Sequence, residues 1–419
     1  DAPRGKVLRI SATGTLGDAE VIVPQGDAVI EGITPTAQFL FVNDLLGGPS
    51  RVRQFTLDGK DSRILPLPEA SGIGGLIDLG DRVVFRQTSF IAPSAWMTYD
   101  PSGGVIKKSA LFNTSPVDFS DIEAVREFAV SKDGTRVPVN ILQRKGTKLD
   151  GNNPALLYAY GGYGHSMRPS FDFENRLWFD RGGIYVVANI RGGGEFGPGW
   201  HQAALLHHKQ NSYDDLAAVA EDLMAQRVTS PQRLGIQGGS NGGLLMGVML
   251  TQRPELFGAV VCQVPLLDMR RYSQLLAGAS WIGEYGNPDL PEARFLLGTA
   301  LLDSGDPVGA EAELRKALDL KHPQDLVVPQ LAKAMLAQGQ AKKLTDELGK
   351  FELTQPSAKA SFLTTLAAAY GSQGKADLSR ESLKAALVAE PGHAPALLAQ
   401  ARQKAGQQDA DGALTMVED

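Results

Sequence analysis

The stretch LGIQGGSNGGLLMGVML, from Leu234 to Leu250, runs a short apolar strand into a cluster of glycines around one serine and then into an apolar helix. Residues 238–242 fit G-x-S-x-G, the pattern of a serine on a strained strand-to-helix turn. Glycine is needed there because side chains would collide in so tight a turn, while Ser240 stands free at the end of the strand. Glycine-rich turns without catalysis are common, so the motif needs support from its surroundings.

Continuous apolar runs surround this stretch, and such runs are typical of a parallel sheet that is covered on both faces. The runs are ALLYAY (155–160), GIYVVANI (183–190), RLGIQ (233–237) and GAVVCQV (258–264). Between them, residues 212–227 place Leu216, Val219, Ala220, Leu223 and Met224 on one face of a helix. Residues 120–290 are therefore predicted to form an α/β domain.

The regions before and after this domain have different residue patterns. Residues 1–119 alternate short β-type runs with turn sequences such as Asp58-Gly59 and residues 100–103, which favours a sandwich, a barrel or propeller blades. Residues 291–419 are helical in pattern and repeat with a period near 34. The repeating positions are Gly305, Gly339 and Gly374; Gly298, Ala332, Ala367 and Ala401; and Pro323, Pro356 and Pro391. This period resembles the tetratricopeptide repeat, whose stacked helices present a concave binding surface; the alternative is a regular helical bundle.

A second glycine motif, Gly192, Gly194 and Gly197, fits the dinucleotide-binding pattern G-x-G-x-x-G. Pro198-Gly199 follows where that fingerprint needs a helix to open, and Asp214 and Asp215 start a helix instead of ending a second strand. We interpret the segment as a loop and expect neither a cofactor nor a metal ion.

Composition sets broad limits on the class of protein. The 419 residues suffice for two or three domains, and 43% apolar with 21% charged residues is ordinary for a soluble globular protein. The net charge of −6, without a basic run, argues against a nucleic-acid partner. No apolar stretch is long enough to span a membrane, and the first residues lack a signal-peptide pattern. The missing initiator methionine leaves both a cytoplasmic and a periplasmic location open. Cys262, the one cysteine, lies in an apolar run and is predicted to be buried.

Five segments together resemble the prolyl oligopeptidase family, serine peptidases that join an α/β-hydrolase domain to a β-propeller. They are LLYAYGGYG, VVANIRGGGEFGPGWHQAALLHHKQNSYDDL, RLGIQGGSNGGLL, QRPELFGAVV and WIGEYGNPD, in the family's order and spacing between residues 120 and 289. The resemblance implies that Ser240 is the nucleophile and that the Asn241 amide and the Tyr160 hydroxyl form the oxyanion hole. It further implies that Trp281 stacks on a substrate proline, with Tyr163 and Tyr285 lining the same pocket; alternatively, these are core aromatics. The β-rich residues 1–119 resemble the last propeller blades more weakly.

The resemblance ends near Asp289, before the aspartate and histidine of a catalytic triad are found. After Ser240 the chain offers only His322 and His393, both at junctions of the helical repeats. His165, His201, His207 and His208 precede the serine and correspond to none of the family's bases. A serine without a base is a weak nucleophile, so we expect peptidase activity to be impaired.

The sequence therefore predicts a composite of three parts: a β-propeller fragment (1–119), an incomplete α/β-hydrolase domain (120–290) and tetratricopeptide-like helical repeats (291–419). Its function by resemblance is that of a serine-type endopeptidase acting on proline-containing oligopeptides. The alternatives are a non-enzymatic scaffold whose helical repeats bind a peptide or protein, and a chimeric chain without a selected function.

Overall fold

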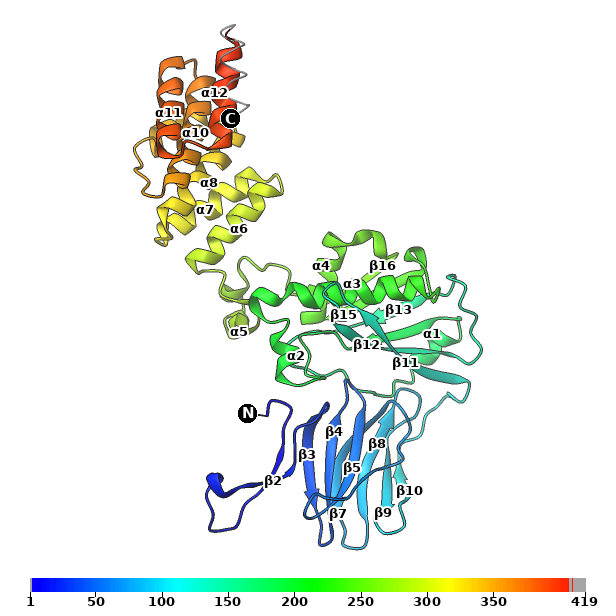
Figure 1. Ribbon diagram of the computed structural model, residues 1–419. Helices are drawn as coiled ribbons and strands as arrows, with labels where there is room; N and C mark the ends of the chain where they lie inside the picture. Colours follow the sequence, from blue (N-terminus) through cyan, green and yellow to red (C-terminus); the bar gives the residue numbers. More distant parts are fainter. Residues whose placement is uncertain (1, 407–408, 410–419) are drawn as a thin grey trace. The chain divides into compact units, whose positions relative to one another are not determined.

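The chain forms two compact units that divide between Gly286 and Asn287. The computed structural model describes residues 2–406 and residue 409. The first unit holds all the β-sheets together with the turn at Ser240, and the second consists of helices (Figure 1). The finer limits suggested by the sequence, at residues 119/120 and 290/291, remain predictions.

Two antiparallel four-stranded sheets make up most of the N-terminal region. Their strands follow one another in chain order: β3 (Val29–Pro35), β4 (Phe39–Leu45), β5 (Ser50–Thr56) and β6 (Ser62–Ile64), then β7 (Ser71–Asp78), β8 (Val83–Ser89), β9 (Ala95–Asp100) and β10 (Val105–Phe112). A two-stranded ribbon, β1 (Val7–Arg9) with β2 (Glu20–Val23), precedes them. Turns fall at Gly59 and after Asp100, as the sequence predicts. Four consecutive strands per sheet is the form of a propeller blade.

A six-stranded sheet carries the Ser240 turn. Its strands are β11 (Ile122–Val130), β12 (Arg136–Arg144), β13 (Ala155–Tyr158), β14 (Ile184–Ala188), β15 (Leu234–Gly239) and β16 (Ala259–Gln263), in the spatial order β11-β12-β14-β13-β15-β16. The last four in that order pair in parallel; three of them lie within predicted apolar runs, and β15 extends the run 233–237 by two glycines. β11 and β12 pair antiparallel, an addition to the parallel sheet that the sequence predicted.

The two long helices of this domain cover one face of the sheet. The side chains of Leu157, Val186 and Ile236 point to that face and form one core with α3 (Gln210–Ala225) and α4 (Asn241–Gln252). On the opposite face, the short helix α1 (Asn175–Phe179) packs beside β14, while Ala259 and Val261 of β16 are exposed. The prediction that the parallel strands are covered on both faces is therefore wrong for β16, because this edge strand receives a helix on one face only.

Cys262 belongs to the same edge strand, and it is exposed instead of buried. Its Sγ lies 3.2 Å from the carbonyl oxygen of Gly243, on the side of α4. An apolar run of sequence predicts burial only when strands lie on both sides, and β16 has a neighbour on one side.

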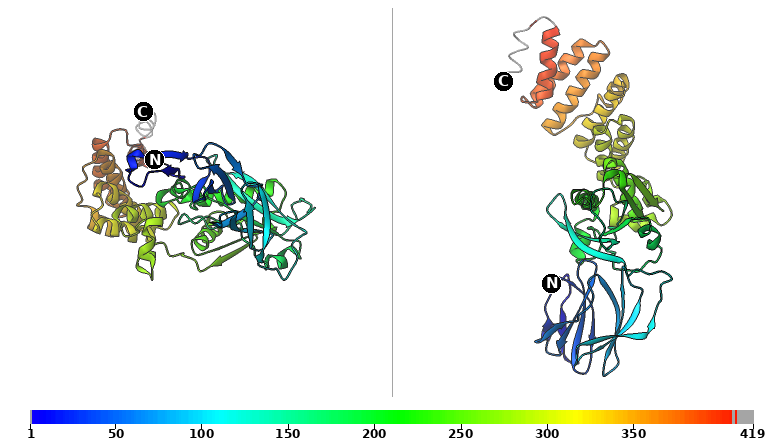
Figure 2. Two further views of the ribbon diagram at one scale, coloured as in Figure 1. Left: turned by 90° about the horizontal axis from the view of Figure 1, so that it is seen from below. Right: turned by 90° about the vertical axis from the view of Figure 1, so that its right-hand side faces the viewer.

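The second unit contains seven helices within the described residues. They are α6 (Pro291–Asp303), α7 (Pro307–Asp319), α8 (Gln324–Ala337), α9 (Ala341–Leu348), α10 (Pro356–Ser372), α11 (Ala376–Ala389) and α12 (Ala394–Gly406), and Figure 2 shows them from two further sides. Gly305, Gly339 and Gly374 stand between successive helices with φ of 83°, 73° and 74°, values that favour glycine. A Cβ on Gly298 would lie 2.6 Å from the Leu314 side chain, so this small residue permits the close contact of α6 with α7. No helix in the described part of the chain is long and apolar enough to cross a membrane.

Candidate active site

Ser240 occupies the turn between β15 and α4, with φ of 55° and ψ of −117°. A positive φ is strained for a residue other than glycine, and such strain is concentrated at functional sites. The Ser240 amide donates to the carbonyl of Gln263 at 3.0 Å, which ties the turn to β16. The serine is exposed at the carboxyl end of the strand, so its hydroxyl is accessible.

The neighbouring glycines are required by space. A Cβ on Gly238 would stand 2.5 Å from the carbonyl oxygen of Gly242, and one on Gly242 would stand 2.8 Å from that of Ala159. A Cβ on Gly239, by contrast, would meet its nearest neighbour at 3.7 Å, an ordinary contact. The strand, the turn and the helix thus approach one another as closely as backbones can.

Asn241 and Tyr160 lie together beside the serine. The Nδ2 of Asn241 donates to the carbonyl oxygen of Tyr160 at 2.5 Å, and Asn241 is the first residue of α4, where backbone amides lack partners within the helix. Tyr160 comes two residues after β13, at the carboxyl edge of the same parallel strands. The helix N-terminus therefore supplies backbone donors next to Ser240, and the Asn241 side chain ties the Tyr160 backbone to the start of that helix.

The three predicted pocket aromatics are only partly brought together. The rings of Tyr163 and Tyr285 meet edge to face with centroids 5.9 Å apart, and Tyr285 also contacts Tyr272 at 5.7 Å. Burial, followed by the hydrogen bond with Tyr163, raises the pKa of Tyr285 well above its usual range. Trp281 ends a short 3₁₀ segment (Gly278–Trp281) just before α5 (Ile282–Tyr285), and in the described part of the chain it makes no ring contact with either tyrosine.

A buried ion cluster beneath these aromatics escaped the sequence analysis. Glu284 is 4% exposed and lies 2.7 Å from both His201 Nε2 and Lys209 Nζ. Burial opposes ionisation of Glu284, but Lys209 and His201 outweigh it and lower its pKa. Burial lowers the pKa of Lys209. No spacing in the sequence links a glutamate to basic residues about 80 positions earlier.

The segment with the second glycine motif is a loop, as predicted. Its contacts are a buried ion pair and a close approach of two backbone segments. Arg191 is 4% exposed and pairs with buried Asp215 of α3 at 2.6 Å. Gly192 has φ of 95°, and a Cβ there would stand 2.3 Å from the carbonyl oxygen of Gly161. A five-residue helix, α2 (Pro198–Gln202), does open after the loop although the sequence analysis expected none. Proline suits that first helical position because its missing N–H needs no partner there.

Four of the six histidines contact other side chains, and His207 and His208 are exposed in the short 3₁₀ segment Leu206–His208. His201 binds Glu284, and the ring of His165 packs edge to face on Tyr160 at 5.3 Å. In the second unit, His322 is buried and stacked on Phe295, and His393 bonds to Glu390 at 2.8 Å. Among the described residues no side chain is hydrogen-bonded to the Ser240 hydroxyl. The triad aspartate and histidine thus remain unassigned.

A strand–serine–helix turn at the edge of parallel strands is the arrangement of an α/β hydrolase. Residues 169–297 match the sequence model of the prolyl oligopeptidase family. An uncharacterized peptidase of Sinorhizobium fredii is 45% identical over 284 residues, which are 66% of this chain and 39% of the relative. The prolyl endopeptidase of Elizabethkingia meningoseptica is 38% identical over 69% of this chain and 41% of its own length.

Solved structures agree with these matches. One from a study of two prolyl endopeptidases superposes with a TM-score of 0.64 at 36% identity, covering 80% of this chain and 50% of the other. A post-proline cleaving enzyme of Rickettsia typhi gives 0.58 at 35% identity, covering 68% and 42%. The chain is thus similar in sequence and in fold to members of the prolyl oligopeptidase family. The chain spans about two fifths of the length of the curated relatives it matches.

Proposed function

We propose that the first unit is a serine-type peptidase module that acts on proline-containing oligopeptides, with Ser240 as its nucleophile. The observation that carries this proposal is the strained, exposed Ser240 between β15 and α4. The Asn241 amide and the Tyr160 hydroxyl are the proposed oxyanion donors. Relatives described as prolyl endopeptidases support the substrate class.

Trp281, Tyr163 and Tyr285 are the proposed substrate-binding aromatics. Tyr163 is exposed, and its ring packs edge to face on the half-buried ring of Tyr285. A substrate could therefore contact the Tyr163 ring, which Tyr285 supports. A proline ring has an apolar face that packs well on an aromatic ring. The half-buried Trp281 provides a larger face for such a contact.

Acyl transfer at Ser240 needs a proton acceptor. As Oγ bonds to the scissile carbonyl carbon, its proton must pass through a base to the leaving amine while the C–N bond breaks. No described histidine is bonded to Oγ; in the second unit, His322 is buried and stacked on Phe295, and His393 bonds to Glu390. We therefore propose that turnover is impaired, with a residual acceleration of roughly 10³ to 10⁴ over water.

The test compares the purified chain with Ser240→Ala on a Gly-Pro reporter peptide. Little or no cleavage by either is expected. Robust turnover that is lost in Ser240→Ala would show that a base exists, and His322→Ala and His393→Ala would locate it.

Binding of a peptidyl-proline ligand tests the site without turnover. Trp281→Ala should weaken this binding, while Trp96→Ala, in the N-terminal sheets, should not.

A second candidate function, a protein-binding scaffold, rests on a groove in the helical unit. A cavity of about 820 Å³ lies at the starts of α8 and α10. Phe295, Leu326, Pro329 and Ala358 give it an apolar lining, and Asp325, Glu390 and His393 add polar groups. We propose tetratricopeptide-like repeats that bind an extended peptide there. Selecting a displayed peptide library on the purified chain should enrich peptides that no longer bind the Leu326→Lys variant. Failure to enrich any sequence would count against the scaffold.

A continuous read of the gene across residues 289–291 would exclude a chimeric assembly.

A further inference from the structure

One face of the central parallel strands is open. The register places Tyr185, Leu156, Gly235 and Ala259 in one row across β14, β13, β15 and β16, and Val187, Tyr158, Gln237 and Val261 in the next. Along these rows exposure increases toward the edge: Val187 is 4% exposed, Tyr158 and Gln237 are intermediate, and Val261 is 43% exposed. We call the part of these rows on β13, β15 and β16 the open face.

The open face contrasts with the opposite side of the same strands. There Leu157, Val186 and Ile236 are fully buried under α3 and α4. Parallel strands are almost always covered by helices on both faces, because both carry apolar side chains. In the described part of the chain, no helix covers the open face as α3 and α4 cover the opposite one.

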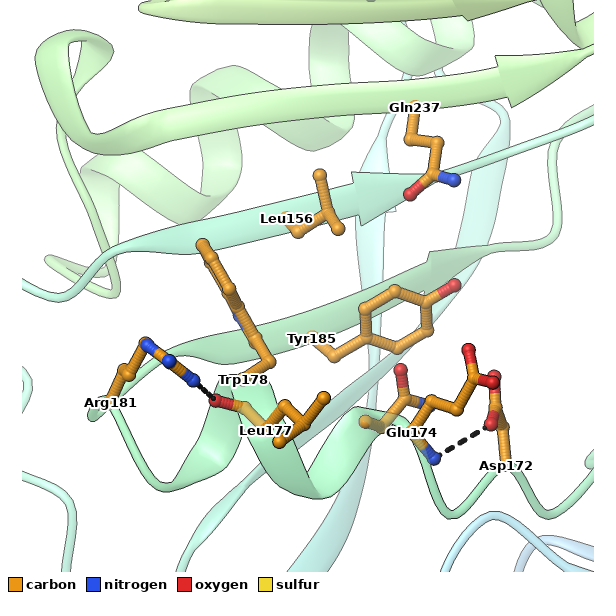
Figure 3. Close-up of a pocket in the computed structure, with 9 residues that line it drawn as sticks. Leu156, Asp172, Glu174, Leu177, Trp178, Arg181, Tyr185 and Gln237 are labelled. Atoms are coloured by element: carbon orange, nitrogen blue, oxygen red, sulfur yellow. Dashed lines mark hydrogen bonds between the residues drawn. The ribbon is translucent and has the colours of Figure 1, made fainter.

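A pocket of about 460 Å³ borders the open face, and its charges are separated. Leu156 and Gln237 line it from the sheet, and Trp178, Tyr185, Arg181, Asp172 and Glu174 are among its other lining residues. Figure 3 shows Arg181 at one end and Asp172 with Glu174 at the other, with the aromatic rings of Trp178 and Tyr185 between them. The backbone amide of Glu174 donates to Asp172 Oδ1 at 2.9 Å, and Arg181 donates to the Leu177 carbonyl at 2.8 Å.

These three charges have no opposite charge beside them in the described part of the chain. A cation next to Trp178 and Tyr185 would gain from the aromatic faces as well as from Asp172 and Glu174. An anion is favoured at the other end by Arg181. An apolar strip between charges of opposite sign matches one kind of partner, a helix with an apolar face and oppositely charged ends.

We propose that the open face binds an amphipathic helix of another polypeptide. The apolar side of that helix would lie over Leu156, Ala259 and Val261, its basic end beside Asp172 and Glu174, and its acidic end beside Arg181. Acidic residues at the N-terminus and basic residues at the C-terminus also suit a helix's own dipole, so the proposal fixes the direction in which the helix lies.

The test uses the full chain and a fluorescent peptide of about 18 residues, long enough to form a helix on binding. The peptide carries leucines at i, i+3, i+4 and i+7, glutamates in its first turn and lysines in its last. Binding is measured by fluorescence anisotropy, with a scrambled peptide of the same composition as the control. Asp172→Lys reverses a charge of the bordering pocket, and Val261→Lys places a charge on the outer strand of the open face. Asp81→Lys makes the same charge change as Asp172→Lys on an exposed aspartate between β7 and β8.

Saturable binding that weakens at least tenfold in Asp172→Lys and in Val261→Lys, but not in Asp81→Lys, would support the proposal. Thermal unfolding of each variant must match that of the unmodified chain, so that weaker binding cannot be explained by an unfolded variant. Failure to saturate at millimolar peptide, equal binding of the scrambled peptide, or equal weakening by all three substitutions would overturn it. A chain that sediments as a dimer, with Val261→Lys returning it to a monomer, would also overturn it, because the occupant would then be a second copy.

Discussion

The hydroxyl of Tyr285 donates a hydrogen bond to Oδ1 of Asn241 across 2.8 Å, while Asn241 itself donates to the carbonyl of Tyr160. The amide of one side chain therefore connects three segments: the end of β13, the start of α4 and the helix α5. This connection links the segments that carry the proposed oxyanion donors to Tyr285, one of the proposed substrate aromatics.

Tyr285→Phe should lower the free energy of unfolding of the first unit by at least about 1 kcal/mol, since it removes the hydroxyl that bonds to Asn241 and Tyr163 and leaves the Asn241 oxygen unpaired. All four tryptophans lie between residues 96 and 281, so tryptophan fluorescence in urea reports on this unit alone. Tyr158→Phe is the control, because its hydroxyl has no hydrogen bond among the described residues. Equal losses in the two variants would contradict a role for the Asn241 bond.

The tight turn at Ser240 gives a pair of matched variants. Gly238→Ala places a methyl group 2.5 Å from the Gly242 oxygen, whereas Gly239→Ala places one 3.7 Å from the Gln263 Cβ. We expect the first to destabilise the unit by about 1–3 kcal/mol and the second by clearly less, because overpacking against a fixed backbone cannot relax. Urea unfolding measures both, and a Gly238→Ala variant as stable as Gly239→Ala would show that the turn is looser than described.

Cys262 should react with a maleimide in the folded chain without denaturant. It is exposed on β16 and is the one cysteine of the sequence, so labelling to one equivalent is assigned without ambiguity. Mass spectrometry gives the stoichiometry, and Cys262→Ser is the blank. Labelling that requires urea would instead support the burial predicted from the sequence.

The error at Cys262 shows what a sequence pattern can and cannot predict. All four parallel strands and the residues of the Ser240 turn follow from local apolar runs and glycine spacing, which act over a few residues. Burial of β16 depends on whether further strands and a helix lie beside it, and the run GAVVCQV contains no such information. The sequence therefore predicts the strand and misses its environment.

The Glu284 cluster with His201 and Lys209 was missed for the same reason. Each of the three is an ordinary polar residue in its own segment, and only the fold brings them within 2.7 Å. Ser240, in contrast, was found from its glycine motif after a predicted strand, and the roles proposed for Asn241 and Tyr160 came from the family resemblance. Parallel strands bring their carboxyl ends to one edge, and both Ser240 and Tyr160 follow such strands in the structure.

Glu195 provides a pH-dependent prediction. It is 1% exposed, and burial, only partly offset by hydrogen bonds from Met167 and Asn189, raises its pKa to about 7. Because the folded pKa lies above the ordinary value, the stabilisation from protonated Glu195 is complete at low pH and is lost as the pH rises through about 7. A rise from 4.5 to about 7 corresponds to roughly 3 kcal/mol.

Glu195→Gln should remove this dependence, because glutamine stays neutral while its oxygen can still accept the bonds from Met167 and Asn189. Between pH 5 and pH 9 the unfolding free energy of the unmodified chain should therefore fall relative to that of the variant, with tryptophan fluorescence as the signal. Glu69→Gln, which alters an exposed carboxylate, should follow the unmodified chain at every pH. Parallel curves for the unmodified chain and Glu195→Gln would mean that Glu195 titrates alike in the folded and unfolded states, and hence that burial does not hold its proton.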